Sequence, residues 1–272
     1  LAAGAAHDVS ELELSNGLRV TCMRTAFRDD EILVHGVAHG GLTQTLPRLA
    51  DAQFATAVAS AHGMLGVPKA QLADALGGVR VSLGRDVDTY RRAIDGECSP
   101  DDLAAQLALI HRLFVAEVRR DDARLATLRA ALREKLADDA RDPLNRFDAL
   151  VTRLNTRDHP FFRAPTPRDV RRFDADWGLA YAAQAFGTPR EFRLVLVGNL
   201  PDAATLEPLL CAHRGSTPDR RGGGEGAGFR GAGAAPMGPF DVAPLDVRFP
   251  ARPVERELAT RLEDAEMCQT KL

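Results

Sequence analysis

The hydrophobic pattern of the first sixty residues changes its period once. Residues 12–23 alternate between apolar and polar on either side of a Ser-Asn-Gly turn, which predicts a strand hairpin. Residues 32–37 form an apolar, β-branched run that ends at a pair of glycines and predicts a third strand. Over residues 48–63 the apolar spacing becomes about 3.6, as in a helix. The sequence therefore predicts three strands followed by a helix.

The later patterns predict more helices than strands. Alternation at 79–85 and 90–97 indicates an antiparallel pair, and Ser99 with Pro100 and two aspartates is a typical helix start. Arg193 is the only charge in the run 192–197, which predicts a central strand covered on both faces. Further helices are predicted at 69–76, 100–156 (three helices, the second starting at Asp121), 167–186 (two helices, capped by Thr166 and Asp174) and 202–211. The fold class is then α+β, a mainly antiparallel sheet with helices on one face.

Composition excludes several classes of protein. The chain has 35 Lys and Arg against 38 Asp and Glu, a net charge of -3, so no basic face for nucleic acid is expected. No apolar run of about 18 residues occurs, so no membrane span is expected. The four cysteines are far apart in the sequence and predict ordinary buried thiols, without a disulfide framework or a zinc ribbon.

Two segments differ in composition from the rest. Residues 1–11 are rich in small residues and are predicted to be a linker. Residues 215–245 are rich in glycine, arginine and proline and are predicted to be flexible. RNA binding by arginine-glycine repeats is an alternative for this segment, but only one or two such triplets occur, which favours a surface insertion.

Five stretches of the chain resemble, in order, the repeated domain of the pitrilysin/insulinase family of zinc metallopeptidases. They are LSNGLRV, FRDDEILVHGVAHGGL, SPDDLAAQLALIHRLF, RLATLRAALREKLADDARDPLNRF and FRLVLVGNL, and they lie between residues 12 and about 210. The second stretch resembles a strand of the family's third repeat. The resemblance implies a domain similar to those of mitochondrial processing peptidase, spanning residues 12–214, with residues 246–272 leading into a following repeat.

The resemblance also implies a role. The third repeat of such an enzyme is non-catalytic and forms part of the wall of the peptide chamber, with zinc in the catalytic half. Its partners would be the other repeats and peptide substrates, in an organelle or a bacterial periplasm. Since the sequence begins with Leu1 and not Met, we expect a fragment or a processed product, with exposed apolar surface left for neighbouring repeats. The alternative is a protease-inactive structural homologue resembling core subunits of the respiratory cytochrome complex.

The family's zinc motif is absent from the corresponding helix. Active members carry two histidines and a glutamate as HxxEH, and here Gln53, Thr56 and Ala57 occupy about those positions. An amide is a poor zinc ligand, alanine is none, and a threonine hydroxyl cannot act as the base. Glu134 lies near the place of the third ligand, and a lone carboxylate does not form a site. We therefore predict no catalytic, cofactor or metal residues here, and no activity of the chain alone.

His35 and His39 are the competing candidates for a metal. Their i, i+4 spacing suits a helix, but the surrounding pattern predicts a strand, on which four residues span about 13 Å. Two nitrogens on one zinc lie only about 3.4 Å apart. A strand therefore excludes a shared ion.

The remaining polar candidates lack the context that their chemistry needs. The other histidines are isolated in the sequence, and the glycine run lacks the Lys-Ser/Thr of a phosphate loop. The serines have no G-x-S-x-G setting, and the cysteine has no histidine at a spacing typical of a catalytic pair. These residues are His62, His111, His159, His213, Ser60, Ser82, Cys98 and the range Gly222 to Gly228.

Overall fold

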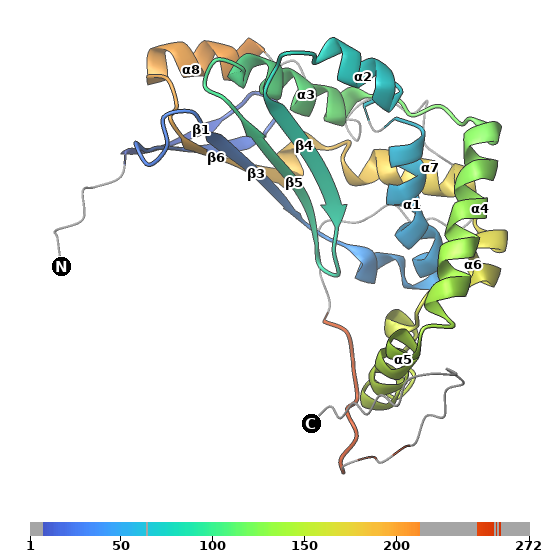
Figure 1. The fold of residues 1–272 in the computed structure, drawn as a ribbon. Helices are drawn as coiled ribbons and strands as arrows, with labels where there is room; N and C mark the ends of the chain where they lie inside the picture. Colours follow the sequence, from blue (N-terminus) through green and yellow to red (C-terminus); the bar gives the residue numbers. More distant parts are fainter. Residues whose placement is uncertain (1–7, 64, 213–243, 253, 255, 257–272) are drawn as a thin grey trace, which may run out of the picture.

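The computed structural model describes residues 8–63, 65–212, 244–252, 254 and 256. Its centre is a six-stranded sheet with the strand order β1-β2-β6-β3-β5-β4 (Figure 1). Only β2 and β6 pair in parallel, and the other neighbours are antiparallel, so the predicted mainly antiparallel sheet is confirmed. The strands are β1 Asp8–Glu13, β2 Arg19–Arg24, β3 Ile32–His39, β4 Val81–Val87, β5 Arg91–Cys98 and β6 Phe192–Gly198.

Eight α-helices and three short 3-10 helices connect these strands in the described part of the chain. The α-helices are α1 Leu49–Ala61, α2 Lys69–Ala75, α3 Leu103–Val115, α4 Asp122–Asp139, α5 Pro143–Asn155, α6 Pro167–Arg172, α7 Ala175–Ala185 and α8 Ala203–Leu210. The 3-10 helices are η1 Leu42–Arg48, η2 Pro160–Phe162 and η3 Pro189–Glu191.

The first hairpin forms where the alternation predicts it. Leu14 N–H donates to the Leu18 carbonyl across the turn, and Gly17 has a φ of 78°, a conformation that side chains with a Cβ rarely adopt. A Cβ at Gly17 would also lie 2.8 Å from the Cβ of Arg190. The strand before the turn begins at Asp8, so part of the predicted linker 1–11 belongs to β1.

The predicted helix caps are largely confirmed. Thr166 and Asp169 form a capping box at α6, Asp174 accepts from Trp177 N–H at α7, and Asp121 caps α4. One start was misplaced: Ser99 Oγ donates to Asp102 in a turn, and α3 begins only at Leu103. The two helices predicted within 167–186 are α6 and α7, with their caps at Thr166 and Asp174.

One face of the sheet is buried under helices and the other is open. In β3, Ile32, Val34 and Ala38 are buried, whereas Leu33 is 48% exposed. The face that is turned down and to the left in Figure 1 carries no helix of the described residues. The prediction that β6 is a central strand is confirmed, since it lies between β2 and β3. The prediction that both of its faces are covered was wrong, because on the open face Arg193 is exposed and Val195 and Val197 are half-buried.

Two clusters of buried side chains hold the layers together. The larger lies between the sheet and helices α1, α3, α7 and α8. The smaller joins α1, α4, α6 and α7, where Phe54 meets Phe173 edge to face at 5.8 Å between ring centroids.

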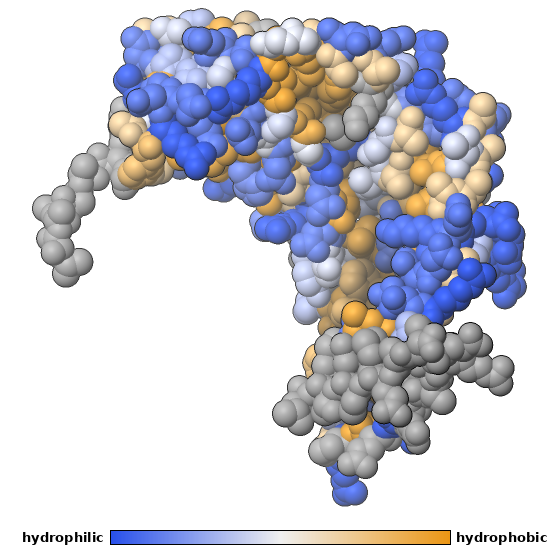
Figure 2. All heavy atoms as spheres, viewed as in Figure 1, coloured by the Kyte–Doolittle hydropathy of each residue, from blue (hydrophilic) through white to orange (hydrophobic). Residues whose placement is uncertain are grey.

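Some apolar residues that pack against the larger cluster are only partly buried, namely Leu72, Leu76, Val81 and Leu83. Figure 2 shows apolar surface beside α3 and β4, between hydrophilic areas.

Candidate functional site

Helix α1 holds the three residues at the positions of the expected zinc motif. Its buried side packs through Ala55 and Ala59 in the larger core and through Phe54 and Val58 in the smaller one. Gln53, Thr56 and Ala57 are spaced i, i+3, i+4, so they share the remaining, partly exposed side of the helix. The backbone therefore presents this face as a metal site would require, but its side chains are an amide, a hydroxyl and a methyl group.

The structure does not direct Glu134 toward α1. Leu132 and Leu136 of α4 pack against the smaller cluster, and Glu134 lies between them in sequence. Two residues along a helix correspond to a rotation of about 200°, so Glu134 points away from that contact. Its side chain is exposed accordingly.

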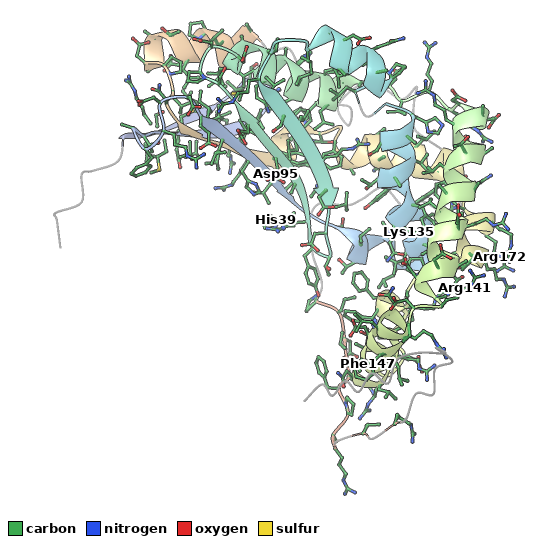
Figure 3. The ribbon with its side chains drawn as sticks, in the orientation of Figure 1. His39, Asp95, Lys135, Arg141, Phe147 and Arg172 are labelled. Atoms are coloured by element: carbon green, nitrogen blue, oxygen red, sulfur yellow. The ribbon has the colours of Figure 1, made fainter. Side chains whose placement is uncertain are left out.

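His35 and His39 lie on strand β3, as the sequence predicted, and both face the open side of the sheet. Across the ladder, His35 pairs with Asp95 and His39 with Arg91. His35 Nδ1 is 2.6 Å from Asp95 Oδ1, an exposed contact; His39 and Asp95 are labelled in Figure 3. Within the described residues, no group of three or more His, Cys, Asp or Glu side chains could hold a metal ion.

The isolated histidines have structural contacts. His62 is buried at the end of α1, with Nδ1 2.8 Å from the Val58 carbonyl oxygen and Nε2 3.0 Å from that of Asp121. His159 Nδ1 accepts from Phe161 N–H at the start of η2. His111 is half-buried on α3. His213 lies outside the described residues, as does the glycine run 222–228.

The hydroxyl and thiol candidates are not set up for nucleophilic attack. Ser60 and Ser82 are exposed. Burial raises the pKa of the Cys98 thiol to about 12 and that of Cys22 to about 11, so both remain protonated near neutral pH. The prediction of buried thiols is confirmed for these two and wrong for Cys211, which is exposed. Cys268 lies outside the described part.

Two arginines that the sequence analysis did not select have the most unusual surroundings. Arg92 is completely buried, with its guanidinium bonded to the carbonyls of His39 and Ala185 and to Glu191. Arg85, on the neighbouring strand, has two buried guanidinium nitrogens without a hydrogen-bond partner. The alternation of the two strands was a signal in the sequence for both arginines. Arg92 lies on the same side of β5 as the apolar Ile94, and Arg85 of β4 pairs with Ile94, so both side chains belong to the apolar side of the sheet.

No helix of the described residues is long and apolar enough to cross a membrane.

Among proteins of known function, the chain is similar to a zinc protease PQQL-like protein of Arabidopsis thaliana, with 28% identity over 212 residues. The match covers 77% of this chain and 20% of that protein. A scan against family models found no match.

Solved structures with the same fold are proteases. The ferredoxin protease FusC, in complex with Arabidopsis ferredoxin, aligns with a TM-score of 0.66 and 21% identity over 80% of this chain and 24% of FusC. The periplasmic protease PqqL of Escherichia coli aligns with a TM-score of 0.63 and 18% identity, over 79% of this chain and 25% of PqqL. An M16-like peptidase of Alicyclobacillus acidocaldarius aligns with a TM-score of 0.61 and 14% identity, over 81% of this chain and 52% of that protein. The chain thus spans between one fifth and about one half of the length of these relatives.

Proposed function

The chain is related in sequence and in fold to the pitrilysin-type zinc metallopeptidases, and from this premise we propose that it is a non-catalytic repeat of such an enzyme. In this role it forms part of the wall of a peptide chamber, while the zinc is held by another part of the enzyme. The proposal concerns the third of four repeats, the one whose strand the segment around Asp30 and Gly41 resembles.

The partly exposed face of α1 is the observation that carries the proposal. Gln53, Thr56 and Ala57 occupy the face that a zinc site would use and supply neither imidazole nor carboxylate. A catalytic zinc needs three protein ligands and an open position for water. A repeat that keeps the fold without these ligands is suited to packing and to enclosing a substrate.

The amphipathic helix α5 supports a place within a larger assembly. Its apolar residues Leu144, Phe147, Leu150 and Leu154 recur at helical spacing, yet none of the 13 residues of α5 is buried, and Leu144 is 41% exposed. Phe147 is labelled in Figure 3. Phe147, Leu150 and Leu154 are half-buried. An apolar stripe that the described part of the chain covers only partly is typical of a surface that packs against a neighbour.

The proposed domain organisation follows the sequence boundaries. Residues 12–214, together with the start of β1 at Asp8, form the repeat. Residues 215–245 are a surface insertion, and 246–272 lead to the next repeat. Within these last two segments, only residues 244–252, 254 and 256 are described.

The proposal is tested by zinc analysis and a quenched-peptide cleavage assay on the purified chain and on a longer polypeptide from the same reading frame. We expect the chain alone to hold no zinc after dialysis and to cleave nothing. The longer polypeptide should hold about one zinc per molecule and cleave peptides in a chelator-sensitive manner.

Two outcomes would contradict the proposal. Zinc-dependent cleavage by the chain alone would require ligands among His35, His39, His62 and Glu134. A longer polypeptide with no zinc and no cleavage would favour the protease-inactive structural homologue.

A further inference from the structure

Arg85 lies on the edge strand β4 with its side chain turned toward the helix-covered face. Its guanidinium carbon stands 5.2 Å from the centroid of the Phe186 ring, at the end of α7. Nε and Nη2 are both buried, and neither has a hydrogen-bond partner. Buried polar groups in folded proteins are nearly always hydrogen-bonded, so these two nitrogens require an explanation.

The neighbouring Arg92 shows how this fold satisfies a buried guanidinium. In the β4–β5 ladder Arg85 stands opposite Ile94 and Val87 opposite Arg92, so both arginines project from the same face. Arg92 also lies over an aromatic ring, that of Phe192 at 5.4 Å, but it has two carbonyl acceptors and the carboxylate of Glu191 at 2.9 Å. Arg85 likewise lies over an aromatic ring, that of Phe186, but its Nε and Nη2 have no acceptor that corresponds to Glu191.

The local charge around Arg85 is therefore uncompensated. The other residues of β4 that share its face are Val81, Leu83 and Val87, and the nearby carboxylates Asp86 and Asp95 belong to the opposite face. Burial lowers the pKa of the Arg85 guanidinium to about 10. Since burying an unpaired charge is costly, an anion that reaches this group gains more than one that meets an exposed arginine.

The two unpaired nitrogens form one edge of the guanidinium plane. Nε and Nη2 carry parallel N–H groups, the geometry that matches the two oxygens of a carboxylate. Neighbouring atoms cover both nitrogens in this structure, so a carboxylate reaches them only when those side chains move aside. Because β4 is the last strand of the sheet and Arg85 as a whole is half-buried, this movement takes place at the surface. The partly buried Leu83 supplies an apolar contact beside it.

We propose that Arg85 and Phe186 form a carboxylate-binding site at the β4 edge, and that its ligand is the carboxylate of a peptide. The acid is either the C-terminal carboxylate or an Asp or Glu side chain, and Leu83 contacts the neighbouring apolar side chain. The site depends on the surroundings of Arg85 and is independent of the proposed chamber role.

The test follows the Nε–H resonance of Arg85 in the ¹⁵N-labelled 272-residue chain. The probes are acetate and three forms of acetyl-Ala-Leu-Ala: with a free C-terminus, amidated, and amidated with the last alanine replaced by glutamate. We expect acetate and the free-acid peptide to move the resonance downfield and to raise the melting temperature. The neutral amide should do neither, and the glutamate form shows whether a side-chain carboxylate is also accepted.

Variants separate binding from a structural role. Arg85→Met keeps the apolar stem that packs on Phe186 and removes the unpaired charge, so it should melt no lower than the parent and bind the free-acid peptide at least about tenfold more weakly. Arg91→Gln removes an exposed arginine from the opposite face of β5 and should leave binding unchanged.

The proposal is overturned if no carboxylate probe moves the Arg85 resonance, or if the neutral amide acts as the free acid does. Equal binding by Arg85→Met would also overturn it. Should Arg85→Met not fold, the response of the parent chain's resonance decides alone.

Discussion

Arg92 and Glu191 form an ion pair in the interior of the protein, with 2.9 Å between Nη2 and Oε2 and side-chain exposures of 0% and 6%. Strand β5 supplies the arginine and the short helix η3, just before β6, supplies the glutamate. The same guanidinium also donates hydrogen bonds to the carbonyl oxygens of His39 and Ala185. The pair thus connects the end of β3, the end of α7 and the entry to β6.

Removing the glutamate should destabilise the fold strongly. Glu191→Ala leaves the buried charge of Arg92 without its carboxylate, and we expect the free energy of unfolding to fall by about 3–5 kcal/mol. Urea unfolding followed by circular dichroism measures this loss. Glu13→Ala is the matched control, since Glu13 pairs with Arg19 on the surface at 3.5 Å and should lose far less. Equal losses in the two variants would show that the buried pair has no special role.

The imidazole of His62 should stabilise the junction of α1 and α4. Both ring nitrogens face carbonyl oxygens, those of Val58 and Asp121, and the side chain is buried. His62→Ala removes both contacts, and we expect the free energy of unfolding to fall by about 1–3 kcal/mol. His39→Ala removes an exposed imidazole and serves as the control. If thermal and urea unfolding do not distinguish the two variants, the His62 contacts contribute nothing measurable.

The buried thiol of Cys98 should make stability depend on alkaline pH. Burial, with a smaller effect from Asp102, raises its pKa from 9.0 to about 12 in the folded protein. The folded chain then keeps a proton that the unfolded chain loses, so this contribution is complete below about pH 9 and is lost as the pH rises toward 12. Between these values the free energy of unfolding should fall by up to about 1.4 kcal/mol per pH unit because of this thiol.

Cys98→Ala isolates that contribution. The variant lowers stability at every pH by leaving a small cavity, but between pH 8 and 10.5 its urea-unfolding free energy should decline less steeply than that of the parent. Parallel declines would mean that the thiol ionises equally in the folded and unfolded chains. Cys211→Ala, at an exposed position, should follow the parent curve.

Local patterns were sufficient to predict which segments are strands and which are helices. Alternation around Gly17 predicted the β1–β2 hairpin, and proline and aspartate signals predicted the starts of α4, α6 and α7. These predictions succeeded because turn geometry, capping and the period of burial depend on residues within a few positions of each other. The absence of a HxxEH motif in α1 was equally visible in the sequence.

The tertiary structure alone decided what lies beside what. Strand β6 inserts in parallel next to β2, although Val20 and its partner Leu194 are far apart in the sequence, and this order makes β4 an edge. Arg85 and Arg92 carry the same charge in neighbouring strands, yet only Arg92 meets a carboxylate, because Glu191 arrives from the distant segment before β6. Such pairings depend on the packing of the whole chain, so no local period encodes them. The sequence by itself thus determined the elements and the missing zinc ligands, and the packing of distant segments determined the open face of the sheet and the unpaired guanidinium at its edge.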